Sequence, residues 1–124
     1  MSISDFRSTF LTLEDRPDGV VATITRPHLS EEENIEVFGK ELIDLVDQYG
    51  CRHIIVSLQQ VTYITSAALG KLIALNRRLH RKSGRLIVCG ALDAVKDVLQ
   101  ASRLNDYFTI ADDVPSALSQ MTVG

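Results

Sequence analysis

Short apolar runs alternate with longer amphipathic stretches along this chain, which predicts that strands and helices follow one another. Residues 8–14 alternate polar and apolar side chains, and after a turn the run 20–25 is rich in β-branched residues, so these two segments are predicted to pair as a hairpin. The nearly continuous apolar runs 53–58 and 85–89 are typical of strands covered on both faces. A short last strand is expected over 108–111.

Four segments have the spacing of amphipathic helices. The first is predicted to be capped by Ser30, to carry the acidic residues 31–33 in its first turn, and to run to about Gln48, before Gly50. The others are expected from Ser66 to the stop at Ser83-Gly84, from about Leu92 to Ala101, and from Val114 to Met121. The side chains expected in the core are Ile35, Phe38, Leu42, Leu45 and Val46 in the first helix, Leu69, Leu72, Ile73, Leu75 and Leu79 in the second, and Leu92, Val95, Val98 and Leu99 in the third.

The resulting order is β-β-α-β-α-β-α-β-α, with short connections. Strand–helix–strand units of this kind require parallel neighbours joined by right-handed crossovers. We therefore expect an α/β fold in which residues 1–124 form one domain, with a mixed sheet of about five strands and about four helices. No linker, low-complexity segment or internal repeat divides the chain.

Composition narrows the classes of function. The chain has 124 residues and a net charge of -3, which does not favour nucleic acid as a partner. Neither a secretory signal nor a long apolar window is visible, so we expect a cytoplasmic protein without membrane insertion. Cys51 and Cys89 are predicted to be buried free thiols, and no metal or cofactor is expected because neither ligand spacing nor a glycine-rich phosphate loop occurs.

The most informative segment is 61–70, where a β-rich stretch runs through small hydroxyl residues into an amphipathic helix. Thr65 or Ser66 can cap that helix with a side-chain oxygen, close to unpaired amides and the positive end of the helix dipole. A hydroxyl at this place can serve as a cap, as a phosphoacceptor, or as both. Ser66 has no glycine-flanked elbow and no evident histidine base, so we expect a protein without catalytic residues.

Charged residues cluster in two places whose role the sequence leaves open. The acidic run 31–33 fits a cation, a basic side chain of a partner, or the dipole of a helix start. The second helix carries a basic stripe, which fits an acidic partner, a phosphate or a solvated face. The stripe consists of Lys71, Arg77, Arg78, Arg81 and Lys82.

The order and residue types of these segments resemble the STAS domain, a family named for sulfate transporters and anti-sigma factor antagonists. The resemblance covers nearly the whole chain and is strongest from Arg52 to Gly70, where the family has an apolar strand, a short V-[TS]-[FY]-[IM] segment and then Asp-Ser-Ser-Gly-Leu-Gly. Here those last six positions, 65–70, read Thr-Ser-Ala-Ala-Leu-Gly. The chain departs from the motif at Thr65, Ala67 and Ala68, and Ser57 stands where the preceding strand often has an aspartate.

The resemblance implies a function in transcription regulation. In the antagonists, an anti-sigma factor with serine kinase activity phosphorylates the first serine of the motif, and the unphosphorylated form binds that factor and frees the sigma factor. Ser66 occupies this position, with Thr65 as a further candidate acceptor. Other STAS domains are scaffold components of signalling assemblies, lipid-transport subunits or tails of anion transporters, so a non-phosphorylated scaffold or transport-complex subunit is the alternative.

We thus expect a protein-binding switch whose docking surface is the Ser66 junction and the outer face of the helix that follows. Neither the individual partner nor the oligomeric state follows from the sequence. The residues predicted to contact the partner are Thr65, Ser66, Ala67, Leu69, Lys71 and Arg78.

Overall fold

A computed structural model describes residues 3–30 and 34–123. The chain forms four α-helices, seven strands and one short 3-10 helix in the described residues. The strands are β1 (Leu11–Arg16), β2 (Gly19–Ile24), β3 (His28–Leu29), β4 (His53–Ser57), β5 (Tyr63–Ile64), β6 (Arg85–Cys89) and β7 (Thr109–Ala111). The helices are η1 (Ile3–Asp5), α1 (Ile35–Asp47), α2 (Ser66–Arg81), α3 (Asp93–Ala101) and α4 (Val114–Val123).

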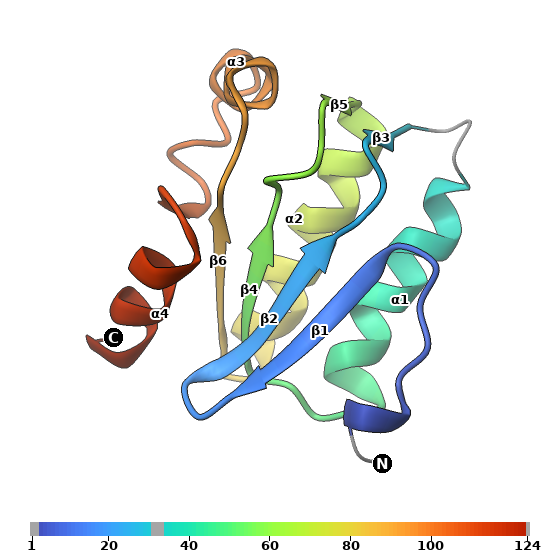
Figure 1. Cartoon of the computed structure of the whole chain (residues 1–124), viewed down its shortest axis with the longest axis vertical. Coiled ribbons are helices and arrows are strands. Elements are labelled where there is room, and N and C mark those ends of the chain that lie inside the picture. Colours follow the sequence, from blue (N-terminus) through green and yellow to red (C-terminus); the bar gives the residue numbers. More distant parts are fainter. Residues whose placement is uncertain (1–2, 31–33, 124) are drawn as a thin grey trace.

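The main sheet has five strands in the order β1-β2-β4-β6-β7 (Figure 1). β1 and β2 pair antiparallel as a hairpin, and β2, β4, β6 and β7 are parallel neighbours. The predicted α/β class, the hairpin and the mixed five-stranded sheet with four helices are therefore confirmed. The carboxyl ends of the parallel strands all lie at the same end of the sheet, and α2 begins beyond that end.

Helices cover both faces of the central strands. Ile54 and Val56 of β4 belong to the larger core, which α1, α2 and α3 cover. Ile55 belongs to the smaller core on the opposite face, against Ala117 and Met121 of α4. In Figure 1, α1 and α2 lie together on one side of the sheet and α4 lies on the other. Every residue from Ile54 to Leu58 is fully buried, as the nearly continuous apolar run predicted, and this includes the polar Ser57.

Two details of the predicted helices are wrong. α1 begins at Ile35 rather than after Ser30, because Asn34 has the left-handed φ of 59° and so cannot lie inside a right-handed helix. The acidic run 31–33 lies outside the described residues. Leu92 is 40% exposed instead of buried, since it precedes α3 in an extended conformation and is not on the helical face of Val95 and Leu99.

A second, two-stranded sheet was not predicted. β3 and β5 pair in parallel beyond the carboxyl ends of the strands of the main sheet, with His28 opposite Tyr63 and Leu29 opposite Ile64. The carbonyl oxygen of Pro27 accepts hydrogen bonds from the backbone N–H groups of Thr62 at 2.7 Å and Tyr63 at 3.1 Å. This small sheet fixes the segment that leads into α2.

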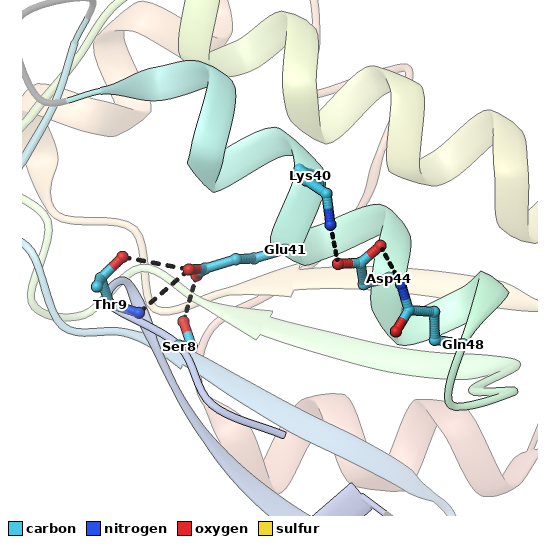
Figure 2. A network of polar contacts seen from close by, with 6 residues as sticks. All are labelled: Ser8, Thr9, Lys40, Glu41, Asp44 and Gln48. Atoms are coloured by element: carbon cyan, nitrogen blue, oxygen red, sulfur yellow. Dashed lines mark hydrogen bonds and ion pairs between the residues drawn. The ribbon is translucent and has the colours of Figure 1, made fainter. Parts of the chain in front are cut away.

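A carboxylate on α1 holds the N-terminal segment against the fold (Figure 2). Glu41 accepts hydrogen bonds from the Ser8 hydroxyl and, at 3.2 Å, from both the backbone N–H and the hydroxyl of Thr9. The Ser8 oxygen in turn accepts from the backbone N–H groups of Phe10 at 3.0 Å and Leu11 at 2.8 Å. These bonds order the chain just before it enters β1, at the edge of the main sheet.

We predict that Gly84→Ala destabilises the fold and that Gly70→Ala does not. A Cβ at Gly84 would lie 2.0 Å from the Arg52 carbonyl oxygen, whereas a Cβ at Gly70 meets nothing within 4 Å. Overpacking of this kind costs about 1–3 kcal/mol of unfolding free energy. Replacing an exposed helical glycine with alanine gains up to about 1 kcal/mol. Urea unfolding of both variants measures the difference, and equal stabilities would contradict the steric argument.

Candidate functional site

Thr65 is the residue that caps α2. Its backbone is extended, with φ of -104° and ψ of 167°, and its hydroxyl oxygen accepts a hydrogen bond from the backbone N–H of Ala68 at 3.4 Å. Its own N–H donates to the Leu29 carbonyl of the small sheet, and its carbonyl accepts from Leu69, both at 3.0 Å. The backbone and side chain of Thr65 are thus committed to joining the small sheet to the start of α2.

Ser66 is the first residue of α2, and its side chain is exposed. Its hydroxyl forms no hydrogen bond with any residue in the ranges 3–30 and 34–123. Of the two residues that the sequence offered as the cap, Thr65 is the one that caps. The Ser66 hydroxyl therefore lies beside the amide groups of the first helical turn and makes no hydrogen bond there that the fold depends on.

A shallow groove of about 180 Å³ opens next to Ser66. Leu69 and Ile73 of α2 line it together with Ser102 and Leu104, which lie in the turn that follows α3. Arg103 has a φ of 58° between these last two residues, which reverses the chain and directs it toward β7. The groove thus places one hydroxyl on each side of an apolar floor.

Sequence reasoning did not predict that Ser102 and Leu104 belong to this site. They lie far from Ser66 in the chain. The segment from Ser102 to Phe108 resembles the STAS family in order and residue type, but that resemblance does not say which side chains face α2. The position of the turn depends on the parallel pairing of β6 with β7, which is a tertiary feature.

Lys71 and Arg78 face α1 rather than Ser66. The Lys71 ammonium lies 2.8 Å from a carboxylate oxygen of Glu36, and Arg78 forms an ion pair with Asp47. The hydrogen bond from Arg78 lowers the pKa of the Asp47 carboxyl below its usual value. Both cations therefore connect α2 to α1, about a third of a helical turn away from the direction of Ser66.

The other two residues predicted to contact a partner lie close to Ser66. Ala67 is half-buried beside it, and Leu69 is 2% exposed, packing mainly into the core while it lines the groove. Of the six predicted contact residues, Thr65, Ser66, Ala67 and Leu69 are thus brought together at the start of α2.

Burial lowers the reactivity of both cysteines by raising the pKa of their thiols. Cys51 and Cys89 are free and buried, as predicted, and burial raises the pKa of the Cys89 thiol to about 11. The Cys89 thiol therefore stays protonated at neutral pH, which makes it a poor nucleophile. Within the part of the chain that the structure describes, no three metal-binding side chains come together, and no helix is long and apolar enough to cross a bilayer.

We predict that Thr65→Ala destabilises the protein by about 1 kcal/mol, because an N-cap hydroxyl is lost. Ser66→Ala should change the unfolding free energy by less than about 0.5 kcal/mol, since that hydroxyl is exposed and makes no internal hydrogen bond. Chemical unfolding of the two variants tests this directly. An equal loss in both would mean that Ser66 shares the cap.

Comparison with known proteins identifies the family. The family model of the STAS domain matches residues 18–117. The chain is 25% identical over 83 residues to the anti-sigma F factor antagonist of Paenibacillus polymyxa, which covers 67% of this chain and 71% of the relative.

Solved structures share the fold at low sequence identity. An anti-sigma factor antagonist from Mycobacterium paratuberculosis superposes with a TM-score of 0.80 at 17% identity, covering 98% of this chain and 99% of that one. The antagonist SpoIIAA, in its unphosphorylated form, has a TM-score of 0.67 at 17% identity, covering 92% of this chain and 98% of the other. Its phosphorylated form, from Bacillus, has a TM-score of 0.62 at 20% identity, covering 83% and 92%. With the family model matching most of its length, the chain belongs to the STAS domain family.

Proposed function

We propose that this protein is a cytoplasmic anti-sigma factor antagonist that docks an anti-sigma factor with serine kinase activity and is regulated by phosphorylation at Ser66. The names of its relatives support this proposal, since the curated relative and the antagonist SpoIIAA are described as antagonists of anti-sigma factors. SpoIIAA has also been solved in a phosphorylated form. The proposed role is one of binding rather than catalysis.

The observation that carries the proposal is that Thr65 caps α2 while Ser66 keeps an exposed hydroxyl. A phosphoacceptor hydroxyl has to reach the active site of a kinase without the helix coming apart. The Ser66 side chain is exposed, and its hydroxyl makes no hydrogen bond with a described residue, while Thr65 supplies the cap. Thr65 is half-buried and its oxygen is already an acceptor, so Ser66 is the better candidate of the two.

The proposed docking surface is the groove beside Ser66 together with the exposed start of α2. Its apolar floor can receive a partner's aliphatic or aromatic side chain, and its two hydroxyls can hydrogen-bond at the rim. Thr65, Ala67 and Leu69 frame this surface. In this arrangement Lys71 and Arg78 act on binding chiefly by fixing α2 against α1, and they touch only a partner that extends around the helix.

A phosphate at Ser66 would act on the partner and not on the fold. The first turn of α2 contains no acidic residue, so a negative charge there is favourable for the helix dipole by about 0.3–1 kcal/mol. The same phosphate brings up to two negative charges to the rim of an apolar groove. A docked partner would have to desolvate those charges, which weakens docking.

We predict that Ser66→Asp weakens binding to the anti-sigma factor at least tenfold, or about 1.4 kcal/mol, while the protein stays as stable as the wild type or becomes slightly more so. Ser119→Asp is the matched control, because Ser119 is an exposed residue of α4 and acquires the same charge away from the groove. Isothermal titration calorimetry with the purified anti-sigma factor gives the affinities. Unchanged affinity in Ser66→Asp would favour the alternative, a constitutive scaffold or transport-complex subunit.

Phosphopeptide mass spectrometry on protein isolated from its native cells tests the modification itself. Trypsin releases the segment from His53 to Lys71, which contains both Thr65 and Ser66. We expect phosphate on Ser66 whose amount changes with growth condition, and none in Ser66→Ala. A segment that stays unmodified under all conditions, or phosphate confined to Thr65, would contradict the assignment.

A further inference from the structure

A long groove follows the seam between α1 and α2 on the side of both helices away from the sheet. Its upper part, of about 330 Å³, lies between Glu36 and Lys71, and its lower part, of about 220 Å³, is lined by arginines. Ile43 and Ala74 line both parts, so the two are continuous. We call this feature the α1–α2 groove. Its lining residues are Glu36, Gly39, Lys40, Ile43, Lys71, Ala74, Arg77, Arg78 and Arg81.

An internal ion pair lies along the upper part of the groove. The aliphatic stem of Lys71 crosses Gly39 so closely that a Cβ at that glycine would lie 2.6 Å from the Lys71 Cδ. The ammonium then meets the Glu36 carboxylate at 2.8 Å. The charges of this end are thus matched within the protein, and they offer little to a charged partner.

The lower part has an excess of positive charge. Arg78 is paired with Asp47, but Arg77 and Arg81 are exposed and form no ion pair with any residue that the structure describes. Lys82 and Arg52 are close enough to Asp47 to lower the pKa of its carboxyl further. Three cations thus act on the Asp47 carboxylate, and Arg77 and Arg81 add two more positive charges to this part of the groove in a protein whose net charge is -3.

The floor of the lower part is apolar. Ile43 is half-buried and Ala74 exposes its small side chain between the helices, directly next to the guanidinium groups. An apolar floor beside two unpaired arginines fits a ligand that carries both an aliphatic side chain and carboxylates. Arginine is well suited to such contacts because its planar group binds a carboxylate through two parallel hydrogen bonds.

This surface is separate from the start of α2. Arg77 and Arg81 lie 11 and 15 positions after Ser66, which corresponds to about 16 Å and about 22 Å along the helix axis. A partner side chain seated in the groove beside Ser66 does not reach them. The role of the α1–α2 groove is thus independent of the modification proposed for Ser66.

From these observations we propose that the lower part of the α1–α2 groove binds an acidic segment of a partner protein, in which carboxylates flank an aliphatic side chain. Arg77 and Arg81 pair with the carboxylates, and the aliphatic side chain covers Ile43 and Ala74. A nucleic acid fits less well, because none of the described residues that line this part of the groove is aromatic and able to stack on a base, and the negative protein as a whole repels a long polyanion.

The test uses the full chain labelled with ¹⁵N and a synthetic peptide, acetyl-Glu-Glu-Leu-Glu-Glu-amide, titrated at about 0.15 M salt. We expect saturable amide shifts confined to the parts of α1 and α2 that line the lower groove. The double variant Arg77→Gln with Arg81→Gln should bind at least tenfold more weakly. The control Lys96→Gln with Arg16→Gln removes the same charge from exposed residues of α3 and β1 and should bind within twofold of the wild type.

Three further titrations can overturn the proposal. The peptide with glutamine in place of every glutamate should not bind, and equal binding would show that charge is not recognised. Inorganic phosphate that produces the same shifts with the same affinity would reduce the groove to a small-anion site. A thymidine oligonucleotide that binds more tightly than the acidic peptide would assign the surface to nucleic acid, and the absence of saturable peptide shifts would refute the proposal outright.

Discussion

The burial of β4 on both faces is the constraint on which the rest of this structure depends. Residues Ile54 to Leu58 have no exposed surface, so helices must cover both sides of the sheet. Parallel strands with helical crossovers then follow, and all the connections that leave the carboxyl ends of the strands lie at the same end of the sheet. The start of α2 lies beyond that end because the connection from β4 to β6 leaves from there. The site is thus a product of the core.

The small sheet converts this general arrangement into a defined junction. Without β3 and β5, the segment between β4 and α2 would be a loop, and the direction in which α2 starts would be poorly fixed. The hydrogen bond from the Thr65 N–H to the Leu29 carbonyl holds Thr65 against the small sheet. The Thr65 hydroxyl in turn caps α2, so the small sheet fixes where the helix starts. This chain has threonine at the motif position where its family typically has aspartate. The side-chain oxygen of threonine still performs the capping that an aspartate oxygen performs at such positions.

Much of the fold could be predicted because its main signals are local and repeated. The apolar run 85–89 predicted where β6 begins and ends, and helical spacing predicted the buried faces of α1 and α2. Both patterns can be recognised within the sequence of a single element. The start of α1 could not be predicted from Ser30, because the left-handed φ of Asn34 is a backbone feature that the pattern of polar and apolar residues does not report. The groove beside Ser66 depends on a turn distant in sequence, and the ion pairs that bind Lys71 and Arg78 to α1 depend on helix packing. The sequence therefore located the junction but not its surroundings.

Thr65 caps α2 and Ser66 does not, and this difference between the two residues has an evolutionary consequence. Selection for a stable fold acts on Thr65, whose loss weakens the start of α2, but it places almost no constraint on the hydroxyl of Ser66. A lineage could lose or regain a serine at that position in a single step without passing through an unstable intermediate. Regulation in such a domain can drift while its architecture stays fixed, so related proteins with the same fold can differ in whether they are switched at all.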